Sequence, residues 1–146
     1  MNHHEKLKYK WLRFSIECGV FGTKNKHLGF IVSTDEENLF CVAVNVTSKW
    51  DARDKARIDR GDPKEVLSWI RAKSQKGSYH FSEDSVIDCA FPKKISYDDF
   101  DRMVEDGKIE LVSPGEDVCE ELIDEVSRGI LASRIVPAII KKTLSS

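Results

Sequence analysis

The fold of this chain is limited first of all by two apolar runs that flank an acidic turn. Residues 28–32 and 39–46 are rich in the β-branched and aromatic side chains that favour a pleated strand. Segment 35–38 between them reads DEEN, which is typical of a turn. The sequence therefore predicts a β-hairpin whose second strand ends in Thr47 and Ser48. A rigid backbone would present this hydroxyl pair to solvent, although such pairs are also ordinary turn chemistry.

Period-two and helical patterns cover much of the remaining sequence. Further strands are predicted over residues 9–18, 85–91 and 108–112, and helices over residues 62–75, 97–105, 115–131 and 134–144. The helix at 62–75 would start at Asp62, with Pro63 in its first position. Strands, a helical insertion, further strands and C-terminal helices together predict an α+β fold around a small antiparallel sheet. Closure into a small barrel would protect the edges of that sheet.

Length and charge set further limits. The 146 residues, 40% of them hydrophobic, fit one domain spanning residues 1–146. Residues 1–8, with His3 and His4, are expected to form a flexible tail. A net charge of −2 argues against binding of nucleic acid by bulk electrostatics, so any such contact must come from a local patch.

The cysteines and the absence of long apolar runs bear on location. Cys18, Cys41, Cys89 and Cys119 form no C-x-x-C pair, which favours buried free thiols over a zinc site or a disulfide framework. No apolar stretch approaches the roughly 18 residues that span a bilayer, and the N-terminus lacks the apolar part of a signal peptide. We therefore expect a cytoplasmic protein with no membrane partner.

Two histidines, His27 and His80, are the strongest candidates for acid–base catalysis. Each stands where a loop meets a predicted strand. With an ordinary pKa of roughly 6.5, one imidazole can accept a proton while another donates one, which is what metal-free RNA cleavage requires. The competing interpretation is that both are polar residues at strand ends without a catalytic role.

Cations and one aromatic residue surround these positions in the sequence. The candidate RNA-binding residues are Lys24, Lys26, Lys49, Trp50 and Arg53. The tryptophan could stack on an unpaired base and the cations could bind phosphates. The alternative is a solvated charged loop, because Asp51, Asp54 and Asp59 are interleaved with the basic residues.

No cofactor or metal is predicted. The acidic groups at 98–101 and 116–121 show no recurring ligand spacing and are best read as helix-start charges. The sequence contains no P-loop, dinucleotide fingerprint, nucleophile elbow or H-E-x-x-H motif.

Four segments within residues 23–91 together resemble the sequence pattern of a known protein family. A basic loop leads into HLGFIVS, a strand ends as VAVNVTS, a charged loop contains RGD, and HFSEDSVIDCAF follows. In this pattern the chain resembles the PemK, MazF and Kid type of small-barrel toxins from bacterial toxin-antitoxin pairs. The resemblance implies an SH3-like β-barrel, a homodimer, a cognate antitoxin and metal-independent cleavage of single-stranded RNA.

Site residues can be carried over from this family only in part. Thr47 and Ser48 match the position of its hydroxyl residue. The loop before the second strand carries Lys26 and His27 where the family has an arginine. Lys26 would then supply the charge, or His27 the proton chemistry.

Two functional hypotheses follow. The first is a toxin-like endoribonuclease in which His27 and His80 act as base and acid in an unassigned order, with Thr47 or Ser48 bonding the phosphate. The second is a non-catalytic barrel that binds a protein or nucleic acid. A further possibility is a toxin of the same scaffold that poisons a protein target.

Overall fold

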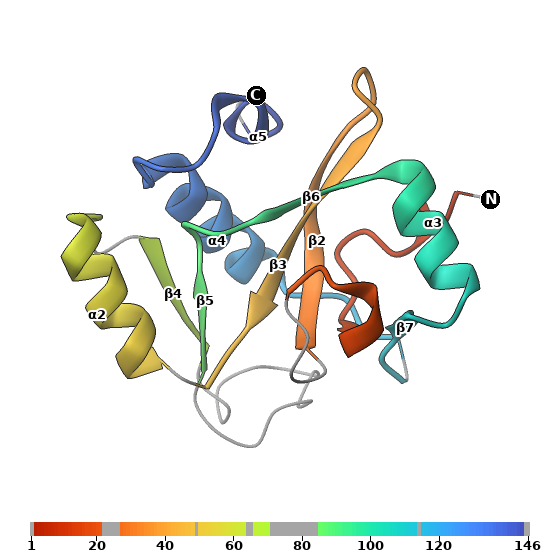
Figure 1. The fold of residues 1–146 in the computed structure, drawn as a ribbon, viewed down its shortest axis with the longest axis horizontal. Helices are drawn as coiled ribbons and strands as arrows, with labels where there is room; N and C mark the ends of the chain where they lie inside the picture. Colours follow the sequence, from red (N-terminus) through yellow and green to blue (C-terminus); the bar gives the residue numbers. More distant parts are fainter. Residues whose placement is uncertain are drawn as a thin grey trace.

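A computed structural model describes residues 2–21, 27–48, 50–63, 66–70, 85–113 and 115–144. The strands are β1 (Leu12–Phe14), β2 (His27–Asp35), β3 (Phe40–Val46), β4 (Leu67–Ile70), β5 (Ser85–Asp88), β6 (Lys93–Ser96) and β7 (Ile109–Leu111). The helices are α1 (His3–Lys6), the 3₁₀ turn η1 (Ile16–Cys18), α2 (Trp50–Arg60), α3 (Tyr97–Glu105), α4 (Glu120–Ala132) and α5 (Ala138–Lys141). The predicted α+β class is confirmed (Figure 1).

The predicted hairpin forms the centre of a five-stranded antiparallel sheet with the order β6-β3-β2-β1-β7. The ladder of β2 and β3 runs from Leu28 opposite Val46 to Asp35 opposite Phe40, with a register shift between Ile31 and Ser33. The Asp35 carboxylate closes the turn by accepting hydrogen bonds from the backbone N–H groups of residues 37 and 38, at 3.0 and 2.9 Å. The expected side-chain chemistry of this turn is therefore present.

The large sheet and the smaller β4–β5 sheet are linked just beyond the end of β3. The first half of β3 pairs with β6. Beyond its end, Thr47 and Val86 of β5 exchange backbone hydrogen bonds of 2.9 and 2.8 Å, and β5 pairs in turn with β4. Among the described residues, no strand pairing closes the large sheet into a barrel, since β6 and β7 lie at its edges.

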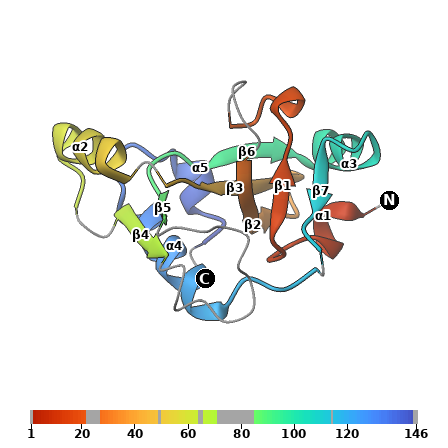
Figure 2. The ribbon, with the colours of Figure 1, turned by 90° about the horizontal axis from the view of Figure 1, so that it is seen from below.

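Apolar side chains cover both faces of the large sheet. On one face Phe30, Val42 and Val44 belong to the core that also contains Val126 and Ile130 of α4. On the other face Phe14, Ile31 and Cys41 belong to the core that contains Phe100 of α3. Figure 2 shows α4 and η1 on opposite sides of the sheet. The two cores identify the face on which each strand residue lies.

The helix predicted over residues 62–75 is wrong where the structure describes it. A helix, α2, already occupies Trp50–Arg60, and Leu67–Ile70 forms strand β4; residues 71–75 lie outside the described part of the chain. Val66, Leu67 and Ile70 fit a helical stripe, but a short apolar run fits a buried strand equally well, and pairing with β5 decides the outcome. Strand β6, directly after Pro92, was not predicted.

Helix α2 is held by a buried ionic cluster rather than by an apolar stripe. Arg60 Nε lies 2.6 Å from Asp62 Oδ2, and Arg60 Nη2 lies 3.5 Å from Asp88 Oδ1 on β5. The two carboxylate side chains are only 0% and 5% exposed. The guanidinium also lies 4.7 Å from the centre of the Phe91 ring. This Arg60 cluster fixes the end of α2 against the β4–β5 sheet.

The N-terminal segment is packed and not a free tail from residue 3 onward. Helix α1 contacts α3, and His4 is 6% exposed. The His4 ring stacks on Tyr97 at 3.7 Å, while its Nδ1 and backbone N each lie 3.1 Å from Asp101 Oδ1. The prediction of a flexible tail over residues 1–8 is therefore wrong at His4. Asp101 and Tyr97 of α3 hold this residue, and such distant partners cannot be recognised from the local sequence.

The prediction of buried free thiols is confirmed for two of the four cysteines and wrong for the other two, which are not fully buried. Cys41 and Cys89 are free thiols within the cores, and burial raises the pKa of each to about 12. Cys18 and Cys119 form no disulfide and are partly exposed. In the described segments, no helix has the length and apolar character needed to cross a membrane.

The cap of α3 is confirmed and gives a stability prediction. Ser96 Oγ accepts a hydrogen bond from Asp99 N at 3.1 Å, and Gly107 takes the left-handed conformation after the helix. We expect Ser96→Ala to lower the free energy of unfolding by about 1 kcal/mol in urea denaturation. Ser127→Ala is the control, because this serine bonds the Ile123 carbonyl in its own helix; an equal loss in both variants would contradict the cap.

Candidate functional site

The candidate site lies at the end of the sheet where β2 begins, β3 ends and α2 follows. The ladder between β2 and β3 places Leu28 opposite Val46. Continued by one residue, this register places His27 opposite Thr47. His27 also pairs with Phe14 of β1, so both His27 and Thr47 lie on the sheet face that carries α3. His27 and Thr47 thus lie directly beside Leu28 and Val46, the last residues paired by this ladder.

The imidazole of His27 is partly buried against aromatic rings. The Phe21 ring lies 5.9 Å from it, centre to centre, and packs in turn at 4.9 Å against Phe14. Burial lowers the pKa of His27 below its ordinary 6.5, and the positive charge of Arg53 lowers it further. Both effects disfavour the protonated ring. At neutral pH, His27 is therefore an uncharged imidazole, the form that accepts a proton.

Arg53 comes to this corner from the first half of α2. Its charge acts on His27, which puts the guanidinium within electrostatic range of the imidazole. Helix α2 is fixed at its other end by the Arg60 cluster. A guanidinium offers several N–H donors in a planar fork that matches phosphate oxygens. The corner therefore combines a base with an anion-binding group.

Thr47 follows the end of β3 and is held by backbone hydrogen bonds with Val86 of β5. Its side chain is partly exposed, and the next residue, Ser48, is exposed. A hydroxyl fixed in this way can donate a hydrogen bond to an anion beside His27. Of the predicted hydroxyl pair, Thr47 has the better supported position.

Of the predicted site residues that the structure describes, Arg53 acts electrostatically on His27, and Thr47 directly follows the end of β3. His80, Lys24, Lys26 and Lys49 lie outside the described residues, so their places in the site stay predictions. Trp50 begins α2, and its side chain is not described.

Two neighbours of the site were missed in the sequence. Phe21 contacts His27, but nothing in its loop marked it out. Asn45 lies two residues before Thr47 on β3 and so shares its face, which strand alternation could have indicated. Within the described segments, no three His, Cys, Asp or Glu side chains form a group that could hold a metal ion.

The chain defined by these features is an α+β protein with a histidine, an arginine and a threonine at one corner of its sheet. It matches no model of a known protein family and no curated protein. Function is therefore argued from the chemistry of the corner itself.

Proposed function

We propose that this protein is a metal-independent endoribonuclease that acts on single-stranded RNA. The observation that carries the proposal is the pairing of an uncharged, partly exposed imidazole with a guanidinium: burial and Arg53 both lower the pKa of His27. A neutral base beside a cation suits a reaction in which a hydroxyl loses a proton while negative charge builds up on phosphorus. Thr47 on the same face adds a hydrogen-bond donor.

In the proposed reaction, His27 takes the proton from a ribose 2′-hydroxyl. The 2′-oxygen attacks the adjacent phosphorus, and the bond to the 5′-oxygen of the next nucleotide breaks. Arg53 and Thr47 hydrogen-bond the non-bridging oxygens as their charge increases. The leaving 5′-oxygen takes up a proton, for which His80 is the proposed donor. The products are a 2′,3′-cyclic phosphate and a free 5′-hydroxyl.

The resemblance to PemK, MazF and Kid toxins supports the same proposal. Its hydroxyl position falls on Thr47, and Arg53 of α2 supplies the arginine that the loop before β2 lacks. The SH3-like barrel, the homodimer and a cognate antitoxin belong to this proposal. An antitoxin tail that binds the corner would be acidic, since it would compete with RNA for Arg53.

The test is incubation of the purified protein with end-labelled single-stranded RNA in EDTA. We expect fragments that end in 2′,3′-cyclic phosphate and begin with 5′-hydroxyl. Bound but uncut RNA would instead indicate the non-catalytic binding module. Arrest of growth on expression, with intact RNA, would indicate a protein target.

The lowered pKa of His27 predicts the pH dependence of cleavage. Because a base acts only when unprotonated, the acid limb of the profile should have its midpoint below the ordinary pKa of 6.5, while loss of the proton from the general acid produces a separate fall on the alkaline side. Arg53→Gln removes one of the two causes, so its acid limb should move upward toward 6.5, with a lower maximal rate. The measurement is kcat/KM against pH; a wild-type midpoint at or above 6.5 would contradict the assignment of His27 as the base.

A further inference from the structure

The face that carries His27 and Thr47 continues along β3 in rows of paired residues. Asn45 lies one row from Thr47, opposite Gly29 of β2. Alternate residues on a strand are about 6.8 Å apart, two rises of 3.4 Å. Only glycine fits at position 29, because the Cβ of any other residue would lie 2.2 Å from the carbonyl oxygen of Val44. Among the described residues, the partly exposed Asn45 amide has no hydrogen-bond partner.

The next row of the same face reaches a cation on the edge strand. Ala43 pairs with Lys93 of β6, so Lys93 lies one row beyond Asn45 on the side of His27 and Thr47. Its side chain is exposed and forms no ion pair with the described part of the chain. Base, hydroxyl, amide and ammonium thus follow one another along a single face.

Lys93 stands on the rim of a groove of about 500 Å³ between η1, β6 and α3. Val20, Ile95 and Met103 supply apolar surface, and Lys108 stands on the rim without an ion-pair partner among the described residues. Asp99 on the rim is paired with Arg102. Val20 precedes Phe21, whose ring contacts His27, so one segment forms a wall of the groove and of the candidate site.

We propose that the RNA strand held at His27 continues past Asn45 into this groove, where Lys93 and Lys108 bind its phosphates. The proposal rests on the endoribonuclease function proposed above. The two ammonium groups contribute affinity without regard to sequence, because phosphates are the same in every nucleotide. The Asn45 amide, which can both donate and accept, contacts the edge of a base beside the scissile bond and contributes sequence preference.

The test uses a single-stranded 2′-O-methyl RNA, which cannot be cut because it lacks the attacking hydroxyl. Fluorescence anisotropy measures its affinity at several salt concentrations. We expect Lys93→Gln and Lys108→Gln each to reduce the slope of log K against log salt by about 0.7, with binding roughly tenfold weaker at 50 mM salt. Asn45→Ala should leave the slope unchanged and, on cleavable RNA, spread the cuts over more sequences.

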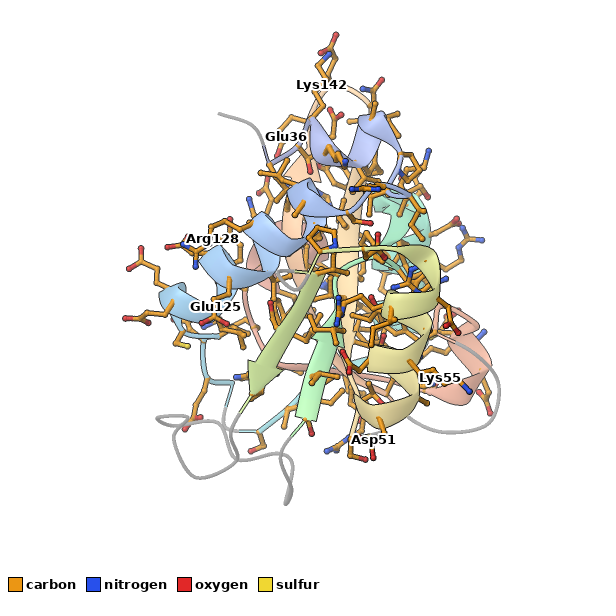
Figure 3. All side chains as sticks on the ribbon, turned by 90° about the vertical axis from the view of Figure 1, so that its left-hand side faces the viewer. Glu36, Asp51, Lys55, Glu125, Arg128 and Lys142 are labelled. Carbon is orange, nitrogen blue, oxygen red and sulfur yellow. The ribbon has the colours of Figure 1, made fainter. Side chains whose placement is uncertain are left out.

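The matched control is Lys142→Gln. Figure 3 shows Lys142 at the opposite end of the molecule from Asp51, which marks the first turn of α2. The neighbouring Thr143 bonds Ser33, at 2.7 Å, away from the groove. If wild-type protein cuts RNA but the Lys93 and Lys108 variants bind like the control, the path through the groove is wrong while the proposed function stands. If wild-type protein neither binds nor cuts RNA, both proposals fall.

Discussion

Replacement of His27 by alanine is expected to lower the rate of RNA cleavage by about 10²–10⁴-fold, the usual contribution of a positioned base. The loss should appear in kcat, because Arg53 and Thr47 still bind the phosphate. His27 is only partly buried, so the fold should persist. The measurement is single-turnover cleavage of end-labelled RNA in EDTA, with circular dichroism of both proteins as the check on folding.

Chemical rescue makes this experiment specific to proton transfer. Free imidazole in the buffer should restore part of the activity of His27→Ala, with a rate that follows the concentration of its neutral form. His3→Ala is the matched histidine control, since His3 lies in α1 with its Nε2 3.6 Å from Glu105 Oε1 of α3. Full activity in the His27 variant would remove the base from the mechanism, and a loss without rescue would point to a merely structural histidine.

Arg60→Met is expected to lower the free energy of unfolding by about 3–5 kcal/mol, because it leaves two buried carboxylates without a cation. Methionine keeps much of the side-chain volume, so the effect is mainly electrostatic. Asp62 and Asp88 are almost inaccessible to water and each keeps one buried oxygen without a hydrogen-bond partner even in the wild type. Urea denaturation monitored by tryptophan fluorescence measures the change.

The control for this variant is Arg102→Met on α3. Arg102 and Asp99 also form an ion pair, but their side chains are 64% and 59% exposed, and such pairs contribute at most about 1 kcal/mol. A triple variant, Arg60→Met with Asp62→Asn and Asp88→Asn, should recover part of the loss because it removes the buried charges as well. Equal losses in the Arg60 and Arg102 variants would contradict the importance of burial.

Local patterns were enough to predict the parts of the fold that depend on neighbours in sequence. The hairpin follows from two β-rich runs around a turn that Asp35 closes through its own backbone neighbours. The start of α3 follows from Ser96, whose bonding partner lies three residues away. Each feature needs only side chains within one turn or one strand pair.

Segments decided by distant partners were not predictable in the same way. Helix α2 has no sustained apolar period, and its anchor is the contact of Arg60 with Asp88 on another strand. Leu67 and Ile70 gain their strand geometry from β5, which comes much later in the chain. His4 is buried only because α3 supplies Asp101 and Tyr97.

The candidate site likewise has features that local sequence predicts and features that depend on distant packing. Strand alternation and the end of an apolar run identified Thr47, and its position at a loop boundary identified His27. The approach of Arg53 to His27 depends on how α2 packs beside the sheet, which no local pattern encodes. Sequence reasoning could therefore name the chemical groups but not their arrangement.

The backbone hydrogen bonds between Thr47 and Val86 place the candidate site where two sheets meet, not at the tip of a loop. A shift of the smaller sheet against the larger one would therefore move Thr47. Exchange of a surface loop alone would therefore not reproduce or change the geometry of the site, because that geometry depends on how the two sheets are joined.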